Sequence, residues 1–213
     1  MKPEKIKVIF NGLDTSKILN KRDAASIEKP FAFLVTSLGE VSERKGFDYL
    51  IQGFANFLRR SGAKNAGLVI IGDGEKMDAF KRLAGSLGIE KQVIFTGFLD
   101  NPYPYLAASD VFAMTSKNEG ISNALLEGIY LGNAAISTIA GGVREIIEHG
   151  KQGFLVEYGD VEKLGEYLDR LYKDPELRAS LACEGYKMVT GTFSMEKMTR
   201  EIVAFCSNIA AQK

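Results

Sequence analysis

The sequence predicts an α/β fold with a doubly wound, six-stranded parallel sheet (Rossmann-like) that helices cover on both faces. Six short runs of apolar and β-branched residues alternate with amphipathic segments, as expected when crossover helices join parallel strands. The 213 residues are 46% hydrophobic and 25% charged, which is ordinary for a globular domain. No internal repeat or proline-rich linker interrupts the pattern, so we expect a single domain over residues 1–213.

The elements follow in order along the chain. In residues 1–30, the segment 7–14 predicts an entry strand ending in an Asn-Gly turn, and 15–30 a polar connection. The sheet core occupies 31–160, with strands at 31–38, 67–72, 92–97, 111–116, 134–139 and 153–156. Helices are predicted between them at 46–60, 75–87, 103–108, 122–132 and 142–149. Residues 161–213 predict three further helices, at 161–173, 175–190 and 195–209.

Composition excludes several classes of protein. Lys plus Arg and Asp plus Glu both number 27, so no charge excess favours nucleic acid as the main partner. The isolated Cys183 and Cys206 and the single His149 cannot build a disulfide framework or a metal cluster. We read His149 as a residue at a helix end, not as a catalytic base. The first residues lack a signal-like apolar stretch and no run nears the ~18 residues of a membrane span, so we expect a cytoplasmic protein with at most peripheral membrane contact.

The strand order predicts where a ligand binds. In the common order 3-2-1-4-5-6 the first and fourth strands are neighbours, and ligands lie outside their carboxyl ends. The loop after the first strand begins at Gly39 and contains Lys45, whose ammonium suits a phosphate. The loop after the fourth strand leads into a helix whose first backbone N–H groups suit a diphosphate: those of Gly120, Ile121, Ser122 and Asn123. Simple turn glycines and a solvated lysine are the alternative interpretation.

Two carboxylates, Glu119 and Glu127, flank that helix start. Glu127 lies four residues beyond Asn123, which is about 6 Å along a helix at 1.5 Å per residue. A ribose diol lies about that far from its diphosphate, and a carboxylate accepts both hydroxyls. The alternative, an ordinary surface glutamate, is disfavoured by the apolar neighbours of Glu127.

With these residues the sequence resembles the C-terminal, donor-binding domain of a retaining glycosyltransferase of the GT-B type, family four. The segment 119–127, E-G-I-S-N-A-L-L-E, is similar to that family's E-x₇-E motif. Other similar segments follow in order over roughly residues 6–206, at 8–14, 44–46, 71–74, 93–97, 109–112, 141–145 and 153–156.

The resemblance implies a role for each candidate residue. Glu127 would bind the donor ribose, and Glu119 would be the catalytic carboxylate beside the transferred sugar. The backbone of 120–123 and the Lys45 ammonium would hold the diphosphate, near Gly39. Gly97 and Phe98 would border the base, although Phe98 fits a core position equally well.

The implied reaction transfers a hexose from a nucleotide-diphosphate sugar, with UDP favoured over GDP, to a glycan or lipid-linked acceptor, with retention. Neither a cofactor nor a metal is implied. A nucleotide-sugar epimerase-like domain and a non-catalytic nucleotide- or partner-binding module stay open as alternatives. A dehydrogenase is disfavoured, because no G-x-G-x-x-G follows the first strand.

The sequence departs from the family pattern in two ways. Glu40 stands five positions before Lys45, where the family commonly has an arginine. Either Arg44 or Lys117 could supply the lost charge, or Glu40 could point to solvent. The N-terminal acceptor domain does not fit in 213 residues, so we expect this chain alone to be inactive.

The last predicted helix carries an apolar stripe with spacings of 3 and 4 residues: Met195, Met198, Ile202, Phe205 and Ile209. Packing on its own domain is the favoured interpretation. In GT-B proteins the last helix crosses back to the other domain, so an exposed stripe driving self-association is the alternative.

Overall fold

The computed structural model describes residues 6–210, so the outermost ends of the predicted domain 1–213 lie outside it. A six-stranded, fully parallel sheet has the order β3-β2-β1-β4-β5-β6, which confirms the predicted topology. Its strands are β1 (Phe33–Leu38), β2 (Ala66–Ile71), β3 (Val93–Gly97), β4 (Val111–Met114), β5 (Ala134–Thr138) and β6 (Gly153–Val156). All but β3 are buried almost throughout, as expected for strands covered on both faces.

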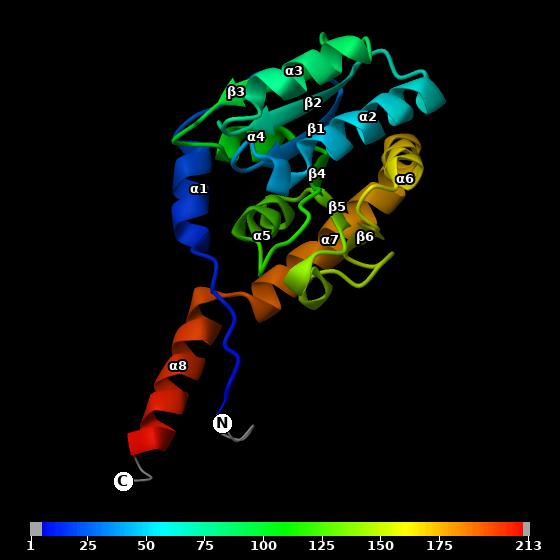
Figure 1. Ribbon diagram of the computed structural model, residues 1–213. Helices are drawn as coiled ribbons and strands as arrows, with labels where there is room; N and C mark the ends of the chain where they lie inside the picture. Colours follow the sequence, from blue (N-terminus) through cyan, green and yellow to red (C-terminus); the bar gives the residue numbers. More distant parts are fainter. Residues whose placement is uncertain (1–5, 211–213) are drawn as a thin grey trace.

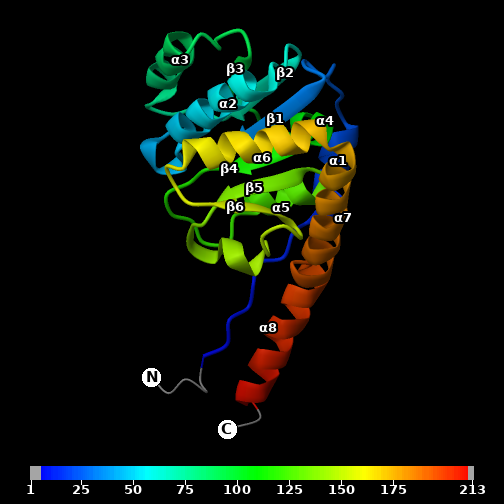
Figure 2. The same cartoon turned by 90° about the vertical axis from the view of Figure 1, so that its right-hand side faces the viewer.

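Helices form a layer on each face of the sheet (Figures 1 and 2). The first layer packs α2 (Phe47–Ser61), α3 (Met77–Ser86) and α6 (Val161–Lys173) onto one apolar core, with α2 and α6 side by side. The second packs α1 (Thr15–Asp23), α4 (Tyr103–Ala108) and α5 (Asn123–Tyr130) onto the other. Helix α7 (Pro175–Thr192) contributes to both cores, which ties the two layers together.

The amino-terminal region differs from the prediction. Residues 7–14 form no regular strand, only an isolated bridge between Leu13 and Ser194. The expected polar connection contains helix α1, whose first turn is capped by Asp14 through a 3.0 Å bond from the Lys17 N–H. Ile18 is the buried residue of α1, so the segment has almost none of the apolar periodicity that identifies a helix in a sequence.

The predicted α-helix at 142–149 is also wrong. A 3₁₀ turn at Gly141–Glu145 replaces it, because Gly141 has a left-handed φ of 51° and packs directly against the Glu119 carbonyl. His149 therefore is not at a helix end. Its Nδ1 accepts the Leu155 N–H at 3.0 Å, and its ring packs against Phe154 and Tyr167.

Helix α8 (Met195–Ala210) extends away from the two layers, beside the amino-terminal segment (Figures 1 and 2). None of its residues is buried, and Ile202 is 43% exposed, so the favoured interpretation of the stripe as core is wrong. The helix instead meets the amino-terminal segment near its start, where the Gly12 N–H donates to Met198 Sδ at 3.1 Å.

Candidate functional site

The loops after β1 and β4 lie together at the carboxyl edge of the sheet. The Lys117 N–H donates to the Arg44 carbonyl at 2.9 Å, and the Thr115 hydroxyl donates to the Lys45 carbonyl at 3.1 Å. Gly46 makes this contact possible: its φ is 64°, and an added Cβ would lie 2.2 Å from the Thr115 carbonyl oxygen. The two loops predicted from strand order are therefore in direct contact.

Glu119 is the centre of a charged cluster between these loops. Its carboxylate accepts hydrogen bonds from Lys45 Nζ at 2.5 Å, Ser116 Oγ at 2.9 Å and Arg44 at 3.2 Å. Burial opposes ionisation of Glu119, but these hydrogen bonds and the charges of Lys45 and Arg44 outweigh it and lower its pKa. In the free chain, Glu119 is thus a carboxylate paired with the cation predicted to bind phosphate.

Helix α5 begins four residues after Glu119, at Asn123. Ser122 is buried and caps the helix, accepting the Leu125 N–H at 3.4 Å. Among the described residues, no acceptor takes the backbone N–H groups of 120–123; this is normal for the cap Ser122 and for Asn123, whereas 120 and 121 precede the helix. The 3₁₀ turn after β5 supports this loop, because a Cβ on Gly142 would lie 2.8 Å from Ile121 Cδ1.

Glu127 and Asn123, both on α5, line a hollow of about 310 Å³. Its remaining walls come from the amino-terminal segment, α1, α4 and the start of α8. Burial raises the pKa of Glu127, while a 3.4 Å hydrogen bond from the Tyr103 hydroxyl and the charge of Lys17 lower it less. A half-buried carboxylate facing a hollow is available to a ligand with hydroxyl groups.

Tyr103 and Lys17 are neighbours of Glu127 that the sequence did not indicate. Burial, followed by the charge and hydrogen bond of Glu127, raises the pKa of Tyr103 to about 12, so its hydroxyl stays a neutral donor. Lys17 lies on α1. Recognising Asp14 as a helix cap would have predicted that helix and placed Lys17 on it.

The other predicted residues lie around this edge. Gly39 is covered by the Lys45 side chain, since an added Cβ would lie 3.1 Å from Lys45 Cε. Gly97 ends β3, and its carbonyl accepts the Gly72 N–H at 2.9 Å. Phe98 is 77% exposed, so the core alternative is wrong for this residue.

The charged residues around the two loops indicate which cation could take the place of the arginine that the family commonly has at position 40. Glu40 is exposed. Lys117 pairs with Glu43 at 2.9 Å, so its ammonium is engaged away from Glu119, whereas Arg44 reaches the Glu119 cluster. Arg44 is therefore the better placed of the two substitutes.

Within residues 6–210, no group of three or more His, Cys, Asp or Glu side chains is placed to hold a metal ion.

Comparison with known protein families gives a clear match. The model of the family described as glycosyl transferases group 1 matches residues 20–188. The chain belongs to this family. The GT-B resemblance drawn from the sequence is thereby confirmed, and the six-stranded sheet is the fold of a GT-B glycosyltransferase domain.

Two curated relatives match most of the chain. The lipopolysaccharide core biosynthesis glycosyltransferase LpsE of Rhizobium meliloti is 35% identical over 91% of this chain and 55% of its own length. The N-acetyl-alpha-D-glucosaminyl L-malate synthase of Bacillus anthracis is 30% identical over 94% of this chain and 53% of its own length. This group 1 glycosyl transferase chain thus spans about half the length of the relatives it matches.

Solved structures have the same fold. Alr3699/HepE of Anabaena, in complex with UDP, superposes with a TM-score of 0.83 at 25% identity, over 97% of this chain and 58% of that one. The C-terminal domain of the group 1 family protein LpcC from Francisella tularensis has a TM-score of 0.71 at 27% identity, over 88% of this chain and 97% of that domain.

In the described part of the chain, no helix is both long and apolar enough to span a membrane.

Proposed function

We propose that this chain is the donor-binding half of a glycosyltransferase that moves a hexose from a nucleotide-diphosphate sugar to a glycan or lipid-linked acceptor, with retention. One observation carries the proposal. Two sites involve the start of α5: the Lys45–Glu119 cluster, whose Glu119 lies in the loop just before the helix, and the hollow lined by Asn123 and Glu127 of the helix itself. A diphosphate at the helix start can reach the first while its ribose reaches the second.

The residues take the following roles. The free N–H groups of 120–123 and the Lys45 ammonium neutralise the diphosphate and stabilise the charge that develops as it leaves the sugar. Glu119 stays ionised beside the transferred sugar. The Glu127 carboxylate accepts both ribose hydroxyls, and Gly97 with the exposed ring of Phe98 borders the base.

The relatives support the choice of donor and acceptor. HepE has been solved with UDP and with UDP-glucose, which favours a uridine nucleotide here. Relatives are named for lipopolysaccharide core biosynthesis and for transfer to a diphospho-undecaprenol-linked acceptor, which favours a glycan or lipid-linked acceptor. Cys183 and Cys206 are both free and exposed, which suits a reducing, cytoplasmic compartment.

Calorimetric titration of the chain with UDP, GDP and ADP tests the proposal. We expect UDP to bind best and the Glu127→Ala variant to lose at least about tenfold in affinity, because a charge-assisted hydrogen-bond pair is removed. Sugar transfer by the chain alone should be undetectable, because the chain spans only about half the length of the relatives it matches. Equal binding by the variant, or no nucleotide binding, would contradict the proposal.

A further inference from the structure

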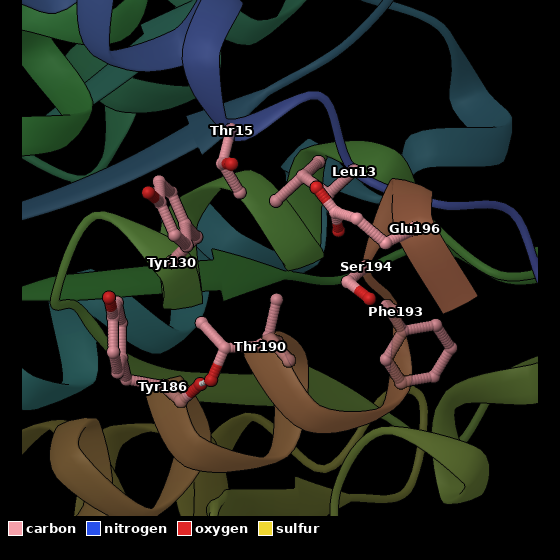
Figure 3. Close-up of a pocket in the computed structure, with 9 residues that line it drawn as sticks. Leu13, Thr15, Tyr130, Tyr186, Thr190, Phe193, Ser194 and Glu196 are labelled. Atoms are coloured by element: carbon pink, nitrogen blue, oxygen red, sulfur yellow. Dashed lines mark hydrogen bonds between the residues drawn. The ribbon is translucent and has the colours of Figure 1, made fainter. Parts of the chain in front are cut away.

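A second hollow, of about 240 Å³, lies where α1, α5, α7 and α8 meet (Figure 3). Side chains from four segments line it: Thr15 from α1, Tyr130 from α5, Tyr186 and Thr190 from α7, and Ser194 and Glu196 at the start of α8. Pockets for drug-sized molecules measure about 300–1,000 Å³, so this hollow suits a smaller ligand.

Two aromatic rings form one side of this hollow. Tyr130 and Tyr186 stack with ring centroids 5.5 Å apart and planes 21° apart, and Tyr186 is 44% exposed. Leu13 and Val189 add apolar surface. This wall suits a ligand that has an apolar face of C–H groups.

Phe193 is a further apolar lining residue, and the rest of the lining consists of hydroxyl groups and one carboxylate. Hydroxyls both donate and accept, so those of Thr15, Ser194 and the two tyrosines adapt to a ligand's own hydroxyls. The Glu196 carboxylate accepts from two neighbouring hydroxyls at once. Among the described residues that line the hollow there is no Lys, Arg or His, which disfavours a phosphate or another anion.

A single pyranose ring has the matching chemistry, since one face presents C–H groups and its edge carries hydroxyls. We propose that this hollow is a carbohydrate-binding subsite, separate from the donor site, that takes one neutral sugar unit of a glycan. The subsite does not depend on the proposed function, because none of its polar groups takes part in nucleotide binding.

The subsite lies close to the donor hollow. Leu13, which is buried and bridges to Ser194, lines both hollows. Glu127 and Tyr130 lie one helical turn apart on α5 and line one hollow each. A glycan held at the subsite would therefore lie beside the hollow lined by Asn123 and Glu127.

Titration of the ¹⁵N-labelled chain with glucose, galactose, mannose and N-acetylglucosamine, each to about 50 mM, tests this proposal by NMR, because single-sugar affinities lie near the millimolar range. We expect amide shifts at residues 130, 186, 190, 194 and 196 with at least one sugar. Tyr186→Ala and Glu196→Gln should each weaken that binding at least about threefold. Both side chains are exposed, so the variants should keep the fold, which thermal unfolding checks.

Matched controls separate this site from the donor site. Tyr158→Ala and Glu201→Gln remove a similarly exposed ring and a second carboxylate of α8, and should leave sugar binding unchanged. UDP should bind normally to the Tyr186 and Glu196 variants, and sugar should bind normally to Glu127→Ala. The proposal is overturned by an absence of shifts, by shifts confined to residues 116–127, or by a stronger response to tetramethylammonium than to any neutral sugar.

Discussion

Replacing Gly46 with alanine should damage both the stability of the chain and its affinity for UDP. The residue has a φ of 64°, and left-handed backbone costs an L-residue about 1–2 kcal/mol. In addition, the new methyl group would lie 2.2 Å from the Thr115 carbonyl oxygen and 2.9 Å from the Tyr158 ring. Overpacking of this kind costs about 1–3 kcal/mol more. The contact that would have to open is the one joining the loops that carry Lys45 and Glu119.

Gly62 provides the matched control. Its φ is 65°, nearly the same as that of Gly46, but nothing lies within 4 Å of an added Cβ. Gly62→Ala should therefore lose only the backbone contribution of about 1–2 kcal/mol and keep its UDP affinity. Urea unfolding of both variants, followed by calorimetric titration with UDP, separates the two effects. If Gly46→Ala is no less stable than Gly62→Ala and binds UDP equally well, the steric reasoning is refuted.

Four further predictions concern charges at the site. Burial raises the pKa of Glu127, so the ionised form of this residue reduces the stability of the fold. Glu127→Gln should therefore melt at a higher temperature than the wild type at pH 7, by about 2–4 °C for each kcal/mol of stability gained. This difference in melting temperature should grow as the pH rises through the pKa of Glu127. As the pH is lowered from 7, the ratio of wild-type to Glu127→Gln affinity for UDP should fall before pH 4.5, the ordinary pKa of glutamate, is reached, because the ionised carboxylate is the form that accepts both hydroxyls. A constant ratio between pH 7 and 4.5 would argue against this. Lys45→Met should weaken UDP binding about tenfold or more and raise the pKa of Glu119, measured by carboxyl-resolved NMR, whereas Lys117→Met, which removes a cation paired elsewhere, should do neither. Glu40→Arg should tighten UDP binding several-fold in calorimetry by replacing repulsion with attraction, and an unchanged or lower affinity would show that Glu40 does not face the ligand.

The sheet was predictable because its signal is local. Each strand is a short apolar run between turn residues, and burial on both faces leaves such runs uninterrupted by charge. Helix α1 was missed because its sequence is polar on nearly every side, and only its cap at Asp14 marks its start. The turn at Gly141–Glu145 was misjudged because its shape is set by the Glu119 carbonyl, 22 residues earlier in the chain.

The candidate site was predictable to the level of residues but not of contacts. Parallel order brings the loops after β1 and β4 together, so the proximity of Lys45 and Glu119 follows from topology. Their direct pairing does not follow, since it depends on the left-handed turn at Gly46 and on Ser116 as a third partner. The periodicity of α8 likewise predicts an amphipathic helix but cannot specify what covers its apolar side.

The pairing of Lys45 with Glu119 has a consequence for how the donor would bind. The Lys45 ammonium donates to the Glu119 carboxylate at 2.5 Å and has two further N–H groups, so a diphosphate would either share this cation with Glu119 or compete for it. The competition costs little if Arg44 and Ser116 keep Glu119 ionised after Lys45 turns to the phosphate, as their own bonds to that carboxylate allow. Glu119 would then keep its bonds to Arg44 and Ser116 and give up only the bond to Lys45 when a diphosphate is present. On this reasoning the carboxylate and the cation form one unit, and removing either changes the charge state of the other.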